Sequence, residues 1–207
     1  MKKTKSLILS IVFLLLLISV LAASYILPQK PKNHFPFYLY SSFGAHNKTN
    51  FHPSGRMGDV NTLRIAGYCK KQPYSGKSCI KLSYDISDAK QIENNWAGVY
   101  WLEPPNNWGV MPDTGFDLTG AKKLVFHARG EKGGEVVTFQ VGGIQGEYGD
   151  TTFVCLPSIE ITNEWTKYEI DLEDKKLSRI IGGFCCVFNK SYNPRGAVIY
   201  LDEIYYE

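Results

Sequence analysis

The sequence predicts an all-β domain, a two-sheet antiparallel β-sandwich of the jelly-roll type, preceded by one N-terminal hydrophobic helix. Short segments rich in β-branched and aromatic residues recur at intervals of roughly a dozen residues, separated by Gly, Pro, Asn and Asp. Several of them alternate apolar and polar residues, as strands with one buried face do. Aromatic residues also make up 14% of the chain, and large rings suit the half-buried surface of a sheet.

Residues 1–27 are predicted to be either a signal anchor or a cleaved signal peptide. Three lysines precede an apolar run from Leu7 to Leu27, which Pro28 ends. At ~1.5 Å per residue, a helix of this run would cross a bilayer core of ~30 Å. Residues 20–23, Val-Leu-Ala-Ala, also resemble a signal-peptide cleavage site. In both interpretations the lysines stay in the cytoplasm, and the rest of the chain is extracytoplasmic, either membrane-anchored or secreted.

Residues 28–34 are predicted to be a linker, and residues 35–207 the β-sandwich domain. The chain has 207 residues and a formal net charge of +3. Because three lysines lie before the apolar run and no acidic residue does, the remainder has a net charge of zero. A body without excess positive charge has no field to attract nucleic acid, so we expect no nucleic-acid partner.

Ten strands account for the repeating pattern. In chain order they are Phe37–Tyr40, Thr62–Cys69, Cys79–Ile86, Trp96–Leu102, Lys123–Arg129, Val136–Ile144, Thr152–Ile161, Thr166–Leu172, Gly183–Phe188 and Ala197–Tyr206. The segment Cys79–Ile86 has apolar residues at every second position from Ile80 onwards, and Thr166–Leu172 repeats this alternation. A short helical turn is expected over Asp174–Ile180.

The strand Trp96–Leu102 leads into a Pro-Pro pair, which cannot donate ladder hydrogen bonds and therefore ends the strand. Alternation puts Trp96 and Tyr100 on one face of this strand and Trp101 on the other. We expect Trp101, and Trp108 beyond the prolines, to be core residues or loop anchors.

Alternation also suggests a ligand-binding face. A turn at residues 131–134 joins the strands Lys123–Arg129 and Val136–Ile144, so we expect these two strands to be neighbours with a common outer face. Polar side chains and aromatic rings on such a face would form an open groove for a ligand. The predicted ligand-binding residues are Trp96, Tyr100, His127, Arg129, Thr138 and Gln140.

Recognisable catalytic motifs are absent from the sequence. It has no Gly-x-Ser-x-Gly, no His-Glu-x-x-His and no Cys/His zinc spacing. Carboxylates such as Glu131 and Glu135 could in principle form a glycosidase pair, but exposure to solvent is the simpler interpretation. We therefore expect no enzymatic activity and assign no catalytic residues.

The five cysteines allow disulfides if the domain lies outside the cytoplasm. Cys69 and Cys79 flank a turn-rich segment and are predicted to form one. Cys155 could pair with Cys185 or Cys186, and an odd thiol remains in any scheme. The alternative is that all five are small buried residues.

A structural Ca²⁺ is predicted from two aspartates. Alternation on the last strand puts Asp202 on one face with Val198, Tyr200 and Ile204, where an ionised carboxylate requires a partner or a cation. Asp59 supplies a second carboxylate at the end of an expected flexible loop, residues 54–59. The alternative is a salt bridge from Asp202 to an arginine, either Arg56 or Arg64.

A series of short motifs runs through residues 35–207. They are Pro53–Asp59, Trp96–Trp101, Asn106–Gly109, Asp117–Ala121, Ala128–Glu131, Val141–Gly143 and Tyr200–Ile204. Together they resemble the galactose-binding-domain-like jelly rolls, a superfamily that includes many carbohydrate-binding modules of secreted glycosidases. Where this chain has His127, members of that superfamily often have a larger aromatic residue.

The resemblance implies a non-catalytic module that binds a polysaccharide or glycan. The N-terminal segment, interpreted as an anchor, adds that the module is extracytoplasmic and contacts the membrane through its helix. The resemblance also implies a structural Ca²⁺ with an Asp of the last strand among its ligands, which corresponds to Asp202. Because one fold serves many functions, a cell-surface structural or protein-interaction domain without a sugar site is the alternative.

Overall fold

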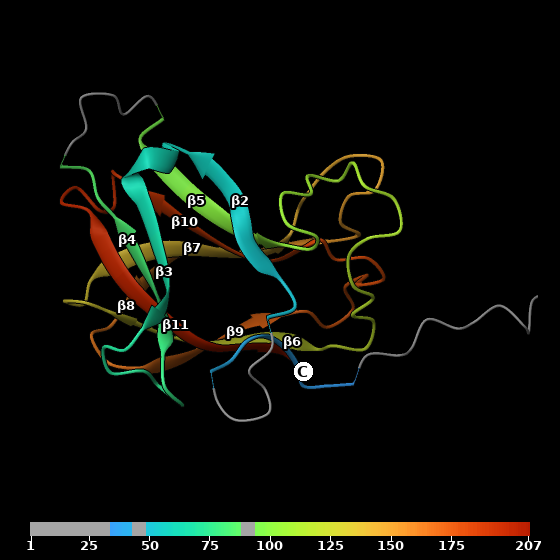
Figure 1. Ribbon diagram of the computed structural model, residues 1–207, viewed down its shortest axis with the longest axis horizontal. Coiled ribbons are helices and arrows are strands. Elements are labelled where there is room, and N and C mark those ends of the chain that lie inside the picture. The colour runs from blue at the N-terminus through green and yellow to red at the C-terminus, as the bar shows by residue number, and fades with distance from the viewer. Residues whose placement is uncertain (1–33, 43–48, 88–93) are drawn as a thin grey trace, which may run out of the picture. The chain divides into compact units, whose positions relative to one another are not determined.

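The computed structural model describes residues 34–42, 49–87 and 94–207, and these fold into a two-sheet antiparallel sandwich (Figure 1). The predicted fold class is therefore confirmed for the domain. The predicted helix at residues 1–27 and nearly all of the predicted linker at residues 28–34 lie outside the described residues. Within the described ranges, no helix combines the length and the apolar character needed to cross a bilayer.

Eleven strands and one 3-10 helix make up the described domain. In chain order they are β1 (Phe37–Tyr40), β2 (His52–Gly58), η2 (Val60–Thr62), β3 (Leu63–Cys69), β4 (Cys79–Tyr84), β5 (Trp96–Leu102), β6 (Lys123–Gly130), β7 (Glu135–Gly142), β8 (Phe153–Ile161), β9 (Thr166–Asp171), β10 (Gly182–Asn189) and β11 (Ala197–Tyr206).

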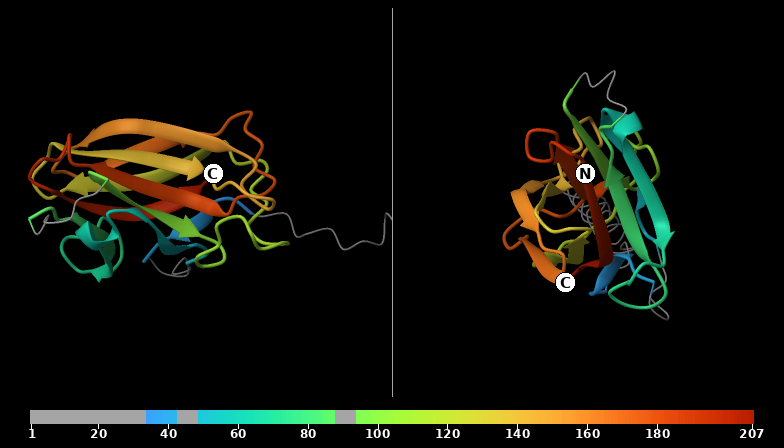
Figure 2. Two further views of the ribbon diagram at one scale, coloured as in Figure 1. Left: turned by 90° about the horizontal axis from the view of Figure 1, so that it is seen from above. Right: turned by 90° about the vertical axis from the view of Figure 1, so that its left-hand side faces the viewer.

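The strands divide into a six-stranded and a five-stranded sheet. The order β3-β4-β11-β6-β9 forms the larger sheet, with β1 also paired to β11, and β2-β5-β10-β7-β8 forms the smaller one. The last strand, red in Figure 2, thus lies inside the larger sheet between β4 and β6. Each sheet turns one face inward, towards the other sheet, and one face outward.

Aromatic rings fill the space between the two sheets. Phe126 of β6 lies 4.5 Å from Phe139 of β7 and 5.1 Å from Phe184 of β10, measured between ring centroids. Trp101 of β5 lies 5.4 Å from Phe184, so the core continues across the smaller sheet. All four side chains are buried. Burial of one such ring contributes about 1.5–3 kcal/mol, and close aromatic pairs add about 0.5–1.5 kcal/mol.

Two elements differ from the sequence-based expectation. Residues 54–59, expected to be a flexible loop, mostly belong to the edge strand β2, which pairs with β5. Pro53 is tolerated there because an edge strand need not donate hydrogen bonds on its free side. The expected helical turn at Asp174–Ile180 is instead an irregular connection that ends in a single β-bridge between Phe116 and Ile180.

The strands β6 and β7 are not neighbours, contrary to the prediction. The turn at residues 131–134 carries the chain from the six-stranded sheet to the five-stranded sheet. Gly133 and Gly134 have φ angles of 85° and 87°, which side-chain-bearing residues rarely adopt. Alternation along each strand predicts which residues face outward, but not to which sheet the strand belongs.

A bulge in β11 changes which side chains share a face. Asp202 lies opposite His127 of β6, and Tyr205 lies opposite Val125. Between these two pairs β11 advances by three residues and β6 by two, and Glu203 has a φ angle of 45°. One additional residue in the strand reverses the alternation beyond it. Ile204 therefore enters the core, although strict alternation predicts it on the face of Asp202.

We predict that Phe139→Ala lowers the free energy of unfolding by about 3–5 kcal/mol, because it leaves a cavity between the two sheets. Chemical denaturation followed by circular dichroism measures this loss. The matched control is Phe153→Ala on β8, a phenylalanine with 56% of its surface exposed, which should cost less than about 1 kcal/mol. Equal losses in the two variants would contradict the described packing.

Candidate ligand-binding face

The outer face of the five-stranded sheet carries a row of side chains that crosses four strands. Register places Tyr100 of β5 opposite Cys185 of β10, which lies opposite Gln140 of β7, which lies opposite Cys155 of β8. Directly opposed residues on adjacent strands point to the same face. Four distant parts of the sequence therefore contribute to one face of the sheet, although Tyr100 and Cys185 are buried there.

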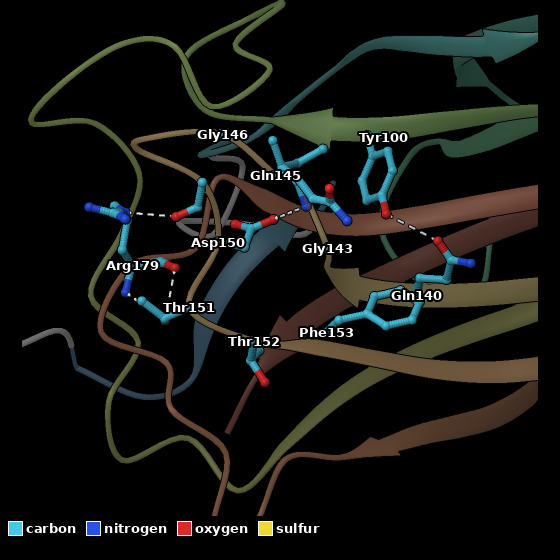
Figure 3. A pocket seen from close by; sticks show the side chains of 12 residues that line it. Tyr100, Gln140, Gly143, Gln145, Gly146, Asp150, Thr151, Thr152, Phe153 and Arg179 are labelled. Carbon is cyan, nitrogen blue, oxygen red and sulfur yellow. Dashed lines mark hydrogen bonds between the residues drawn. The ribbon is translucent and has the colours of Figure 1, made fainter.

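A cavity of about 650 Å³ lies at one end of this row (Figure 3). It is lined by residues of β5, β7 and β8, by the loop between β7 and β8, and by Arg179 just before β10. Tyr100 and Gln140 lie toward one end of the cavity in Figure 3, and Arg179 lies at the other with Asp150 between. A cavity of this size can admit a small ligand or one unit of a polymer.

Tyr100 and Gln140 form a fixed polar pair at the cavity. The Tyr100 hydroxyl lies 3.1 Å from Gln140 Oε1 and 3.0 Å from the Gly142 carbonyl. Burial raises the pKa of Tyr100, so the hydroxyl keeps its proton and can donate. The hydroxyl has one proton for these two acceptors, so Gln140 Oε1 keeps acceptor capacity for a ligand. The Gln140 amide nitrogen can donate to a ligand as well, because its hydrogen-bond partner among the described residues is the weak acceptor Cys155 Sγ, at 3.9 Å.

Two partly exposed aromatic rings stand beside the cavity. Trp108 is 40% exposed, and its ring meets that of Tyr100 edge-on at 6.2 Å between centroids. Phe153 is 56% exposed and packs over Gly143, where a Cβ atom would lie 2.6 Å from its ring. Large exposed rings beside a cavity offer flat apolar surfaces to a ligand.

Asn107 fixes the loop that carries Trp108. Its side chain is fully buried, and its Oδ1 accepts hydrogen bonds from the backbone N–H groups of Gly109, Val110 and Met111 at 3.1–3.3 Å. Its Nδ2 donates to Thr114 Oγ1 at 2.9 Å. One amide thus satisfies a whole turn of backbone donors, which holds Trp108 in place without neighbouring secondary structure.

Asp150 fixes the opposite wall of the cavity. Its Oδ2 accepts from the N–H of Ile144 at 2.7 Å, and its Oδ1 accepts from the N–H groups of Ile181 and Gly182. Burial raises the pKa of this carboxyl, and the three N–H donors act in the opposite direction. Asp150 therefore joins the β7–β8 loop to the start of β10.

Four of the six predicted ligand-binding residues belong to this face. Trp96, Tyr100, Thr138 and Gln140 point outward from β5 and β7. Trp96 lies four residues from Tyr100, which is ~13 Å along an extended strand, so it is remote from the cavity. Tyr100 is only 6% exposed, and it therefore supports the cavity more than it offers a ring face. Their role in binding stays a prediction.

His127 and Arg129 lie on the outer face of the other sheet, which corrects the predicted groove. The ring of Tyr74 stacks on His127 at 3.8 Å, and the Arg129 guanidinium lies 3.9 Å from the ring centroid of Tyr200 and 5.4 Å from that of Trp165. Both predicted residues are buried beneath the connection between β3 and β4. The error follows from assigning β6 and β7 to one sheet.

The structure does not bring Asp59 and Asp202 together. The Asp59 carboxylate, at the end of β2, accepts from the N–H of Asn94 at 3.2 Å. Asp202, in β11 of the other sheet, accepts from the N–H groups of Ser75 at 3.1 Å and Glu203 at 2.9 Å. A Ca²⁺ held by both carboxylates does not fit these separate contacts.

Other features of the described residues bear on the same prediction. Nowhere in the described ranges do three or more His, Cys, Asp or Glu side chains gather in a way that could hold a metal ion. The predicted alternative, a salt bridge from Asp202 to Arg56 or Arg64, is also not among the ion pairs of the described residues. The Arg56 guanidinium instead donates to the Leu63 carbonyl at 2.7 Å. Calcium binding stays a prediction without an assigned ligand set.

The predicted disulfide between Cys69 and Cys79 is not formed. The two residues are opposed in register on β3 and β4, as expected, but both are free thiols. Cys79 Sγ instead donates to the Cys69 carbonyl at 3.5 Å. Burial, with the neighbouring Cys69 thiol, raises the pKa of Cys79 to about 12. Cys155, Cys185 and Cys186 are free as well.

Sequence reasoning missed four residues of the site. They are Trp108, Asp150, Phe153 and Arg179. Three of them lie in loops or at a loop end, where alternation gives no information. The signal that does exist is local: an Asn followed by Trp-Gly at residues 107–109 is typical of a side-chain-capped turn.

Solved structures with a similar fold are carbohydrate-binding modules. A family 30 carbohydrate-binding module matches with a TM-score of 0.56 and 14% identity over 84% of this chain and 88% of that one. Another, from a cellulosomal cellulase of Clostridium thermocellum, matches with a TM-score of 0.52 and 16% identity over 84% and 98%.

A family 11 module of another cellulosomal cellulase from Clostridium thermocellum matches with a TM-score of 0.50 and 12% identity over 84% and 95%. No protein-family model and no curated protein sequence matches the chain. At these identities the likeness shows the fold, the jelly-roll sandwich that such modules share.

We predict that Asn107→Ala lowers the free energy of unfolding by about 2–4 kcal/mol, because three buried or half-buried N–H groups lose their acceptor. The emission of Trp108 should also shift to longer wavelength as its loop loosens. Denaturation followed by tryptophan fluorescence measures both effects. The matched control is the exposed Asn163, whose replacement by Ala should change neither. An Asn107 variant as stable as this control would refute the role of the amide.

The buried Asp202 predicts a dependence of stability on pH. Burial raises its pKa from 3.8 to about 6. The folded state therefore retains a proton that the unfolded state releases, so this carboxyl stabilises the fold at low pH and loses that contribution as the pH rises through about 6. Relative to Asp202→Asn, the wild type should lose about 2 kcal/mol of unfolding free energy between about pH 4 and about pH 7. Urea titrations at the two pH values test this, and a constant difference between the proteins would contradict it.

Proposed function

We propose that this domain is a non-catalytic carbohydrate-binding module that holds a glycan on the outer face of its five-stranded sheet, at the cavity beside Tyr100. The observation that carries the proposal is the combination of partly exposed aromatic rings with fixed polar groups around one cavity. The likeness in fold to solved carbohydrate-binding modules supports it.

The chemistry of a sugar fits this combination. One face of a pyranose ring presents C–H groups, which stack on flat aromatic side chains, and its hydroxyls need directional partners. Phe153 and Trp108 offer ring faces, and the amides of Gln140 and Gln145 offer donors and acceptors. Since Asn107 and Asp150 hold both loops by buried hydrogen bonds, little ordering entropy would be lost on binding.

The absence of catalysis is part of the proposal. A glycoside hydrolase uses two carboxyl groups that flank the scissile bond, ~5–10 Å apart. Asp150 is the one carboxylate among the described residues that line the cavity, and both of its oxygens accept backbone hydrogen bonds. This arrangement supports a binding site rather than a hydrolytic one.

We further propose that the domain works outside the cytoplasm, tethered or released according to the fate of residues 1–27. An extracytoplasmic position would give the binding face access to polysaccharides. Mass spectrometry of the mature N-terminus distinguishes an anchor from a cleaved signal peptide.

A protein-interaction domain on the same fold is the second candidate. The observation that favours it is the apolar tip beside Trp108, where Val110 is 69% and Met111 is 39% exposed. Exposed apolar groups on an ordered loop are typical of contact surfaces. If Val110→Ser abolishes association with a partner protein but leaves glycan binding intact, the two functions are separate.

We predict that Phe153→Ala and Trp108→Ala each weaken glycan binding by about tenfold to one hundredfold, because each removes a stacking surface. Affinity electrophoresis in gels that contain neutral β-glucans, galactans or acidic polysaccharides measures the change. The matched control is Tyr68→Ala, an aromatic residue 78% exposed on the other sheet, which should bind like the wild type. If the Phe153 and Trp108 variants bind every retained glycan as well as the wild type does, this face is not the binding site.

A further inference from the structure

Arg179 is a preoriented cation in the wall of the cavity. Its Nε donates to the Gly149 carbonyl at 2.8 Å, which fixes the plane of the guanidinium. Its backbone is fixed as well, because its carbonyl accepts from the Thr151 N–H at 3.0 Å and its N–H donates to Thr151 Oγ1 at 3.2 Å. The charged group is therefore positioned before any ligand arrives.

The two Nη groups of Arg179 remain available to a ligand. Among the described residues, no carboxylate forms an ion pair with Arg179, and its one side-chain hydrogen bond uses Nε. The Nη groups carry four N–H donors in a planar fork, a geometry that matches the oxygens of a carboxylate or a sulfate. A neutral sugar hydroxyl would use only part of this capacity.

Asp150 does not form an ion pair with the Arg179 guanidinium. The positive charge of Arg179 lowers the pKa of Asp150, but burial is the larger effect and raises it. Both oxygens of Asp150 are bonded to backbone N–H groups of residues 144, 181 and 182. Other charges nearby are on exposed side chains, Glu147 in the β7–β8 loop and Lys176, whose carbonyl accepts from Thr151 Oγ1.

The position of Arg179 relative to the aromatic rings defines a subsite. Figure 3 shows Arg179 and Thr151 at one end of the cavity, with Thr152 and Phe153 following along the wall towards Gln140. A sugar ring stacked on Phe153 would have polar groups of the wall on one side and the guanidinium at the end of the cavity. A negatively charged substituent on that sugar, or on its neighbour, would reach the Nη groups.

We propose that the cavity selects an anionic sugar residue, with Arg179 as the residue that binds its carboxylate or sulfate group. This inference rests on the proposed carbohydrate-binding function and specifies its ligand class. Arg179 acts by ion pairing and bidentate hydrogen bonding, and Phe153 supplies the stacking surface. Binding would then weaken as salt screens the ion pair.

Affinity electrophoresis with three polymers tests the proposal: polygalacturonate, a sulfated galactan and a neutral galactan. The wild type should bind at least one acidic polymer about tenfold more tightly than the neutral one. The preferred acidic polymer identifies the group as carboxylate or sulfate. Arg179→Gln should lose this preference and bind the acidic polymer no more tightly than the neutral one, and added NaCl should weaken acidic binding by the wild type only.

Control variants separate a specific role from a general one. Arg195→Gln removes the same charge from an exposed arginine that does not line the cavity, and it should bind like the wild type. Arg179→Lys keeps the charge without the planar fork and should retain part of the preference. It also covers the case in which the Gln variant does not fold, which a melting curve reveals.

Different experimental results would overturn this inference and the proposed function. A wild type that binds neutral glycans as tightly as acidic ones overturns the role of Arg179 but leaves carbohydrate binding in place. An Arg195 variant with the same loss as the Arg179 variant also overturns it, because net charge alone would then explain the preference. Binding to none of the polymers or neutral β-glucans overturns the proposed function itself.

Discussion

The packing of Phe126 against Phe139 and Phe184 is the contact on which the rest of the molecule depends. It joins the six-stranded sheet to the five-stranded sheet through their inner faces. Because side chains alternate along every strand, fixing the inward residues also fixes the outward ones. The row from Tyr100 to Cys155 therefore faces away from the core between the sheets. Tyr100 and Cys185 of that row are nevertheless buried, in a second apolar cluster with Leu102, Ile144 and Ile181.

Loops complete the site, and two polar side chains, the buried Asn107 and the half-buried Asp150, keep them ordered. Each accepts hydrogen bonds from three backbone N–H groups. Asn107 does so within one loop, and Asp150 links the β7–β8 loop to the start of β10, so each supplies acceptors that these backbone donors need. The rings and charges around the cavity thus rest on a rigid framework, which favours binding by a preformed surface over binding by loop closure.

Alternation and turn residues were sufficient to predict the sandwich, the ten strands and the outward direction of Thr138 and Gln140. They could not predict that the chain changes sheet after β6, so they grouped His127 with the wrong face. Alternation also fails at a bulge, which is why Ile204 faces inward. The residues of the cavity wall lie largely in loops, where position depends on tertiary hydrogen bonds such as those of Asp150 rather than on any local period.

Cys155 occupies the fourth position of the row that crosses the candidate face, and it is the exposed thiol among the five cysteines. Cys79, Cys185 and Cys186 are buried, and burial raises the pKa of each, so they hold little reactive thiolate at neutral pH. A maleimide dye would accordingly attach to Cys155, next to Gln140, in preference to these three thiols, and replacing the half-buried Cys69 by Ser removes the remaining competitor. The natural sequence thus provides a reporter position at which fluorescence can follow the arrival of a ligand in real time.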